Sequence, residues 1–347
     1  MAQQKALFLK EKQGAWEVGT KEVQKPGAGE LLIKIEATAL NPVDWKIQKY
    51  GFFIQNYPAI LGTDAAGTVE AVGEGVTGFA QGDRVLHQGF FSNDKATFQQ
   101  YTIVPAEITA KLPASISFDQ GASVPLALAT AAIGLYGPAE GSVGAGLTPP
   151  WEEGGRGKYA GKPILIFGGA TSVGQYAIQL AKLSGFSPII VTASPKHTQF
   201  LNSLGANHVV DRNAPLTALE SSVAPLLTSQ LEVVYDAVSF ADTQQAGYDL
   251  LAPSGTIVLV LNSQIKEDKS LSKKQVHVFG NVHVPAARKT GVSLYSKLTS
   301  LLESGDLKPN RVEVLPNGLA GIPDGLKRME NDQVSGVKLI AHPQETA

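Results

Sequence analysis

The stretch KPILIFGGATSVGQYAIQLAKLSG, residues 162–185, decides the fold of this chain. Its apolar run PILIF predicts a buried strand, and the segment from Ser172 predicts an amphipathic helix that ends at Gly185. A loop of glycines and small residues joins the two elements. Because the free amides and the positive dipole of a helix N-terminus attract anions, this strand-loop-helix unit predicts a pyrophosphate site.

The loop departs from the usual dinucleotide fingerprint at one position. Aligned on Gly174, the pattern G-x-G-x-x-G reads Gly169, Thr171 and Gly174, so its middle glycine is missing. We expect the small side chains and hydroxyl groups of Thr171 and Ser172 to serve the phosphate instead.

The sequence around this loop predicts two domains. Upstream, short strands such as ELLIKIEATAL, separated by turns, predict a β-rich domain. Downstream, strands and helices alternate, which is typical of a parallel doubly wound sheet. The expected elements are SPIIVTAS, KHTQFLNSLGA, HVVD, PLTALESSVAPLLTS, LEVVYDAVS, TQQAGYDLLAPSG and TIVLVLN, then a helix after about Ser293 and a strand-like tail ending in GVKLIAH. We expect a domain of residues 1–125 completed by 305–347, and a second domain of residues 126–304.

Residues 120–139 carry no charge over a length close to that of a membrane span. Pro125, Gly134, Gly137 and Pro138 interrupt them, so we interpret the segment as a buried helix.

The residues that follow, 138–162, are rich in glycine and proline and carry Trp151. This composition favours a surface excursion, and the alternative is a loop that overhangs or lines the substrate cleft.

Composition excludes several classes of function. A net charge of -2 favours neither nucleic acid nor an anionic membrane. The absence of cysteine excludes disulfides, thiolate metal sites and a cysteine nucleophile. The N-terminus does not read as a secretory signal, so we expect a soluble cytoplasmic protein.

The end of the second predicted strand indicates which dinucleotide binds. NAD sites carry an acid about 20 residues past the loop, whereas a basic residue there matches the 2'-phosphate of NADP. Here that place holds Ser194, followed by Lys196 and His197, and no Asp or Glu occurs between Glu153 and Asp211. The sequence therefore predicts NADPH as the cofactor.

The collinear motifs ALNPVDWK, LGTDAAGTVEAVGEGV, GDRV, GGATSVGQYAIQLAK, LGANHVVD and GVKLI span nearly the whole chain. In this order they resemble the medium-chain dehydrogenase/reductase superfamily. SVGQYAIQLAKLSGF and ASPKH are most similar to its fungal zinc-free branch of trans-acting enoyl reductases and ToxD-like oxidoreductases. The resemblance implies a GroES-like catalytic domain and a Rossmann domain.

The chain departs from the zinc-dependent members of that superfamily. Those members carry a cysteine at the position of Asn41 and a His-Glu pair at the positions of Thr63 and Asp64. Asn and Thr are poor zinc ligands, and the six histidines show no common ligand spacing. We therefore expect no catalytic metal. Without a Lewis acid, hydride transfer to a conjugated C=C bond or a quinone is the expected chemistry, because the negative charge then spreads into an enolate or hydroquinone.

The resemblance also implies roles for individual residues. Lys46 is the first candidate for the proton or oxyanion contact, and Tyr50 is the second. Asp44 is expected to hold Lys46 or the ribose, and Thr130 to contact nicotinamide or substrate. The remaining implied contacts are Ser172, Val173 and Gly174 to the pyrophosphate, Arg212 near the adenine and phosphate, Val260 and Leu261 to the nicotinamide amide, Lys338 and Leu339 at the closing of the cleft, and Trp45 and Phe52 at the substrate.

Two functions stay open at this point. The first is an NADPH-dependent reductase of enones, enals, enoyl thioesters or quinones, acting alone or as the partner of a polyketide synthase. The second is a protein that binds NADPH without turnover, like the lens crystallin relatives of this superfamily. The substrate is unidentified, and the protein is expected to be a monomer or a homodimer.

Overall fold

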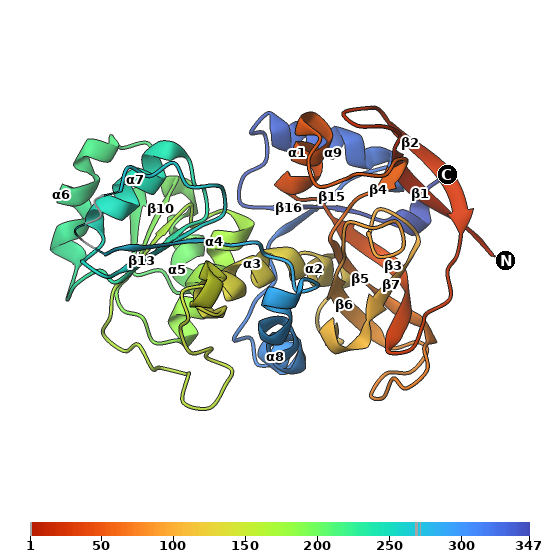
Figure 1. The fold of residues 1–347 in the computed structure, drawn as a ribbon, viewed down its shortest axis with the longest axis horizontal. Helices are drawn as coiled ribbons and strands as arrows, with labels where there is room; N and C mark the ends of the chain where they lie inside the picture. The colour runs from red at the N-terminus through yellow and green to blue at the C-terminus, as the bar shows by residue number, and fades with distance from the viewer. Residues whose placement is uncertain (1, 268–269, 271) are drawn as a thin grey trace. The chain divides into compact units, whose positions relative to one another are not determined.

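Residues 2–267, 270 and 272–347 are described by the computed structural model, and they form two units. The first unit contains the chain up to Leu126 together with Tyr295–Glu303 and Pro309–Ala347. The second unit contains Ala127–Leu294 and Ser304–Lys308. The ribbon of each unit can be followed in Figure 1.

The second unit is built on a parallel sheet. Its strands lie in the order β11-β10-β9-β12-β13-β14, and every pair within it is parallel. The bounds are β9 Ile164–Phe167, β10 Ile189–Ala193, β11 His208–Asp211, β12 Val233–Asp236, β13 Thr256–Leu259 and β14 Lys274–His277. The order runs outward in both directions from β9, so the chain reverses direction between β9 and β12, where such sheets bind ligands at their carboxyl ends.

The bounds of the helical segments between residues 125 and 303 correct two expectations. The segments are α3 Pro125–Tyr136, η2 Glu140–Ser142, α4 Ser172–Leu183, η3 Pro195–His197, α5 Thr198–Leu204, η4 Leu216–Ala218, α6 Leu219–Val223, η5 Ala224–Leu226, α7 Ala241–Leu250 and α8 Pro285–Glu303. Of these, the helices α4, α5 and α7 pack on this sheet. The segment PLTALESSVAPLLTS is three short pieces rather than one helix, and Pro225, which has no amide hydrogen, lies in the last of them. The helix expected after Ser293 begins earlier, at Pro285, because proline fits the first turn.

The charge-free segment of residues 120–139 is two helices rather than one. α2 Phe118–Ala122 begins at Ser117, whose hydroxyl accepts the amide of Gln120, and α3 begins at Pro125. Among the described residues, none of the helices combines the length and the apolar character that crossing a membrane requires.

Residues 138–162 pack back on their own unit. The Trp151 indole donates to the Ser293 hydroxyl at 3.0 Å, and its ring meets Tyr136 edge-on at 5.1 Å. Farther along, Tyr159 stacks on Phe186. The segment is therefore a surface excursion anchored on α3 and α8, and its role at a substrate stays a prediction.

The first unit consists mainly of antiparallel strands. β2 Trp16–Glu22, β1 Gln3–Leu9 and β4 Ala59–Ile60 form one sheet. The other follows the order β15-β16-β3-β5-β6-β8, with β7 beside β3. Their bounds are β3 Glu30–Ala39, β5 Asp64–Val72, β6 Arg84–Gln88, β7 Tyr101–Pro105, β8 Thr109–Lys111, β15 Val312–Val314 and β16 Lys338–Ala341. The helices are η1 Ala106–Ile108, α1 Pro42–Tyr50, α2, η7 Gly318–Gly321, α9 Ile322–Glu330 and η8 Pro343–Glu345.

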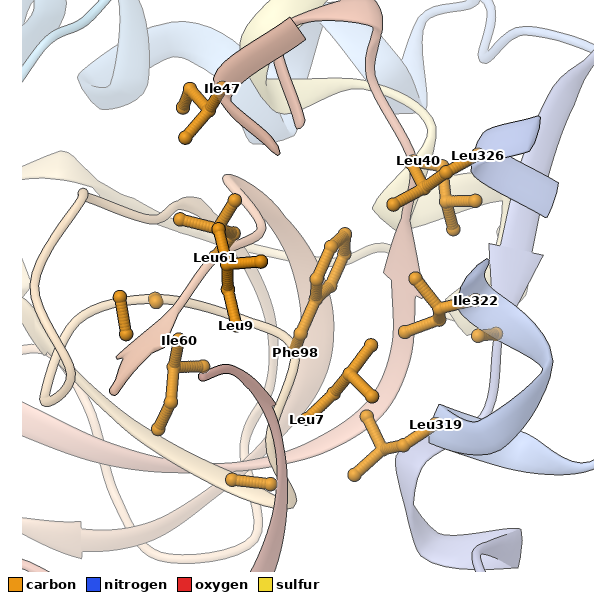
Figure 2. Packing of buried hydrophobic residues seen from close by; sticks show 14 of the residues in the cluster. Leu7, Leu9, Leu40, Ile47, Ile60, Leu61, Phe98, Leu319, Ile322 and Leu326 are labelled. Carbon is orange, nitrogen blue, oxygen red and sulfur yellow. The ribbon is translucent and has the colours of Figure 1, made fainter. Parts of the chain in front are cut away.

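The core of the first unit joins the two ends of the chain. Leu7 on β1 and Phe98 pack with Leu319, Ile322 and Leu326 from the C-terminal segment, as Figure 2 shows. All five side chains are buried, which removes their apolar surface from water and ties the tail to the N-terminal strands. The predicted fold class, a β-rich domain plus a doubly wound parallel sheet, is confirmed.

Candidate functional site

The glycine loop after β9 is pinned to the neighbouring strand β10. The Gly168 amide donates to the Thr192 hydroxyl at 3.1 Å, and the Gly169 amide donates to the Thr192 carbonyl at 2.9 Å. Gly168 has a left-handed backbone with φ of 72°, which only glycine adopts without strain. The loop therefore has a defined path from the strand to the helix.

Thr171, which replaces the middle glycine, is the N-cap of α4. Its hydroxyl oxygen accepts the Gly174 amide at 2.9 Å, which leaves the hydroxyl hydrogen to donate, and a phosphate contact for Thr171 stays a prediction. Gly174 has no room for a side chain, because a Cβ atom there would lie 2.2 Å from the Gly168 carbonyl oxygen. The amides of Ser172 and Val173 are in the first turn, where helix geometry supplies no acceptor. These amides are the donors that the N-terminus of α4 offers an anion.

The predicted ribose-phosphate residues lie at the carboxyl ends of β10 and β11. Lys196 is exposed on η3, while Ser194 is half-buried and His197 is buried. The exposed residue Arg212 donates its backbone amide to the Ala193 carbonyl at 3.0 Å, so it starts from the same edge of the sheet.

This edge also holds a carboxylate. Asp211 ends β11 directly opposite Ala193 in the strand register, and its side chain accepts the Asn213 amide at 2.9 Å. Parallel pairing therefore brings Asp211, the acid that follows the acid-free stretch, beside the end of β10, and the choice of NADPH stays a prediction. At this edge, Lys196 and Arg212 would attract the 2'-phosphate of a bound NADPH, whereas Asp211 would repel it.

The segment after β13, with Val260 and Leu261, is held by a buried network. The Val260 amide donates to the Ser239 hydroxyl at 2.9 Å, and the Ser239 amide donates to the Asp236 carboxylate at 2.7 Å. Burial raises the pKa of Asp236. The buried Gln244 amide donates to the carbonyls of Ser239 and Asn262, at 2.8 and 3.1 Å. Sequence reasoning missed Asp236, Ser239 and Gln244, although polar residues directly after the buried run LEVVY were a signal.

Thr130 lies on α3 beside the segment that follows β14. A Cβ atom on Gly280 would come within 2.0 Å of the Thr130 hydroxyl oxygen, so the two residues are in close contact. The Thr130 carbonyl accepts the hydroxyl of Tyr235 at 2.9 Å. Because β13 and β14 are neighbouring parallel strands, Thr130 and Val260 are both associated with the carboxyl edge of the sheet.

In the first unit, α1 carries the candidate acids. Lys46 is half-buried, its burial lowers the pKa of the ammonium group, and its nitrogen lies 5.6 Å from the centre of the Trp45 ring. Tyr50 is 56% exposed. Asp44 does not hold Lys46: it is fully buried, and its carboxylate accepts the Asn41 amide at 2.8 Å. Burial raises the pKa of Asp44 to about 7.

Next to this helix lies a buried group that we call the Asp64 cluster: Asn41, Thr63, Asp64 and Lys338. The Lys338 ammonium lies 3.0 Å from the Asp64 carboxylate and also donates to the Asn41 side-chain oxygen. The Asn41 amide nitrogen donates to Asp64 at 2.7 Å and lies 3.4 Å from the Thr63 hydroxyl. The side chain of Leu339 is buried in the core. Cofactor contacts for Lys338 and Leu339 stay predictions.

An aromatic group surrounds the end of α1. Phe52 meets Phe53 edge-on at 4.7 Å, and Phe53 stacks on Phe91 at 5.7 Å. Phe53 is 52% exposed. A substrate contact for Trp45 or Phe52 stays a prediction.

Known proteins match this chain over most of its length. The model of the alcohol dehydrogenase GroES-like domain matches residues 27–114, and the model named zinc-binding dehydrogenase matches residues 172–303. The trans-enoyl reductase grgB of a Penicillium species is 30% identical over 344 residues, covering 92% of each chain. This chain belongs to the medium-chain dehydrogenase/reductase superfamily. The predicted GroES-like and Rossmann domains are thereby confirmed.

A further sequence relative and a solved structure are also similar to this chain. The trans-enoyl reductase himH of Aspergillus japonicus is 33% identical over 325 residues, covering 90% of this chain and 89% of its own. The quinone oxidoreductase of Pseudomonas syringae has the same fold, with a TM-score of 0.76 at 24% identity, covering 97% of this chain and 99% of that one.

Dehydrogenases of this superfamily use nicotinamide cofactors, and the residues of the second unit fit one. Gly174 leaves no space for a Cβ atom, and the N-terminus of α4 follows the glycine loop directly after β9, where a pyrophosphate can meet the free amides of the first turn.

Zinc, which the name of one matching model implies, does not fit the Asp64 cluster. Its donors are one amide, one hydroxyl and one carboxylate, and the carboxylate already contacts an ammonium group. Within the described part of the chain, no three His, Cys, Asp or Glu residues are grouped as metal ligands would be.

Proposed function

We propose that this superfamily member is an NADPH-dependent, zinc-independent reductase that transfers hydride to a conjugated C=C bond, in an enone, enal or enoyl thioester, or to a quinone. The observation that carries the proposal is the donor set of the Asp64 cluster, which suits an ammonium group rather than a Lewis-acidic metal. The relatives named trans-enoyl reductases favour an enoyl acceptor. We propose an enoyl thioester as that acceptor, including one carried by a polyketide synthase.

The type of acceptor follows from the charge that develops during the reaction. Reduced nicotinamide, when bound, supplies the hydride. An isolated ketone would then place a full negative charge on one oxygen, which a metal normally stabilises. A conjugated acceptor spreads that charge, so hydrogen-bond donors of the protein suffice to stabilise it.

Lys46 is the donor that we propose for this oxygen. Its half-buried position lowers the pKa of the ammonium group, which makes the group a stronger acid than an exposed lysine. Tyr50 is the second candidate, and Thr130 is a further polar contact. The neighbouring Lys49 is exposed and paired with Glu330, so it is a matched control on the same helix.

For the cofactor, we propose that Lys196 and Arg212 meet the 2'-phosphate of NADPH. Both side chains are exposed at the end of adjacent strands, as a solvent-facing phosphate requires. Asp211 opposes an anion there, but the Asn213 amide already holds its carboxylate.

The test mixes purified protein and NADPH with a panel of enones, enals, enoyl thioesters and quinones and follows absorbance at 340 nm. We expect oxidation with at least one member, and Lys46→Met should lower kcat about 100-fold or more while Lys49→Met changes it little. Tight NADPH binding with no oxidation across the panel would reject the enzyme in favour of a non-catalytic NADPH-binding protein. Equal loss in both lysine variants would reject the role of Lys46.

A further inference from the structure

A lysine ammonium group lies within the core of the first unit. Lys338 is 3% exposed, and Asn41 and Asp64, which its ammonium group contacts, are also buried. A buried ammonium group is strongly unfavourable unless it is paired and hydrogen-bonded. The Asp64 cluster therefore contains its own cation, which is the ammonium group of the Lys338 side chain.

The carboxylate of Asp64 is well supplied with donors. One oxygen accepts the Leu126 amide at 2.5 Å, and the other accepts the Asn41 side chain at 2.7 Å and the Lys338 ammonium at 3.0 Å. Asn41 is held at both ends of its amide, since its oxygen accepts from Lys338 and its nitrogen donates to Asp64. The ammonium group of Lys338 thus contacts both the Asn41 amide oxygen and the Asp64 carboxylate.

This arrangement reaches the helix that carries Lys46. Asn41 is the N-cap of α1, and its backbone amide donates to Asp44 in the first turn of that helix. Lys338 is the first residue of β16. The carbonyl of the next residue, Leu339, accepts the Leu40 amide at 3.0 Å. The C-terminal strand β16 is therefore bonded to the residues at the start of α1 by one backbone hydrogen bond, from Leu40 to Leu339, and one side-chain hydrogen bond, from Lys338 to Asn41.

We infer that Lys338 is the resident cation of the Asp64 cluster and a positioning residue for Lys46: its ammonium group orders Asn41 and Asp64 as a bound metal would, and thereby fixes the start of α1. The final step, that the position of Lys46 matters for catalysis, rests on the proposed function. The cation and the positioning do not.

The first experiment tests the cation without using activity. Wild-type protein prepared with added zinc is analysed for metal by mass spectrometry, and thermal unfolding is compared for Lys338→Met, Asp64→Asn and the double variant. We expect far less than one zinc per chain and a lower Tm for Lys338→Met. Adding Asp64→Asn should recover much of that loss, because the uncompensated buried charge disappears and the released Asn41 amide can turn to accept from the new amide.

Two results of this experiment would overturn the inference. One is stoichiometric zinc in the wild-type protein. The other is a double variant whose losses simply add, because independent sites would show no coupling between Lys338 and Asp64.

The second experiment tests the positioning of Lys46. Lysines are labelled by reductive 13C-dimethylation, and the signal lost in Lys46→Arg identifies Lys46 in NMR spectra. We expect Lys338→Met to move this signal and its titration toward those of an exposed lysine, while Lys338→Arg, which keeps the charge, moves them less. An unchanged Lys46 signal in Lys338→Met would refute the positioning role. If the signal moves but no acceptor is reduced, the proposed function fails and the inference stands.

Discussion

Asp44 should make the first unit less stable as the pH rises, because its pKa is raised in the folded state. Burial is the main cause of its raised pKa, about 7 against 3.8 for a free carboxyl, and the Asn41 amide and the Lys338 ammonium offset only part of that effect. The folded state therefore binds a proton that the unfolded chain has released over this range. The stability that this proton contributes is fully present below pH 3.8 and is lost as the pH rises through 7.

The magnitude follows from the shift. One pKa unit corresponds to about 1.4 kcal/mol. From pH 5 to the folded pKa of about 7 is a span of two units, so the free energy of unfolding should fall by about 3 kcal/mol between pH 5 and pH 8 through this group alone. Asp44→Asn keeps an oxygen that accepts the Asn41 amide but removes the titration. Relative to the wild type, this variant should therefore gain about 3 kcal/mol over the same interval.

Urea unfolding followed by tryptophan fluorescence measures this difference. In a Trp151→Phe background, the remaining indoles, Trp16 and Trp45, both belong to the first unit and report on it alone. The exposed carboxyl Glu11, in the same unit, supplies the control Glu11→Gln. A difference between Asp44→Asn and wild type that is constant with pH, or that shrinks toward pH 8, would refute the reasoning.

Four further predictions concern the second unit. Thr171→Ala should destabilise it by about 1 kcal/mol in thermal unfolding, whereas Thr171→Ser should be near neutral because serine caps equally well; equal losses would disprove the cap. Gly174→Ala, which places a Cβ 2.2 Å from a carbonyl oxygen, should weaken NADPH binding in calorimetry about tenfold or more, and unchanged affinity would contradict the close approach. Lys196→Ala should raise KM for NADPH about tenfold with little change for NADH, and a parallel rise for both would remove Lys196 from the phosphate site. Gln244→Ala removes the side-chain donor to the carbonyls of the buried Ser239 and of Asn262 and should lower stability by about 2 kcal/mol while weakening cofactor binding; an unchanged affinity would show that this network does not support the Val260 segment.

Local patterns in the sequence predicted many of the helices and strands correctly. The strand at Ile164–Phe167, the helix from Ser172 and the stop at Gly185 all follow from residues that are neighbours in the chain. The wrong predictions concern helix boundaries at proline, because hydrophobic periodicity does not show whether a proline begins a helix or breaks one. Pro125 begins a helix instead of interrupting one, and Pro285 begins a helix that was expected only after about Ser293, because a missing amide hydrogen is harmless in a first turn.

The candidate site divides in the same way. The sequence by itself determined the glycine loop, which is a property of one short segment, and the absence of cysteine ligands, which is a property of composition. The choice of Lys46 came from the resemblance to the superfamily and stays a prediction. Only the tertiary structure decided that Asp211 ends beside Ala193, and that Lys338, 297 residues from Asn41, supplies the cation of the Asp64 cluster. Strand pairing made both contacts, and pairing between distant segments depends on how whole elements pack, which no local pattern of residues records.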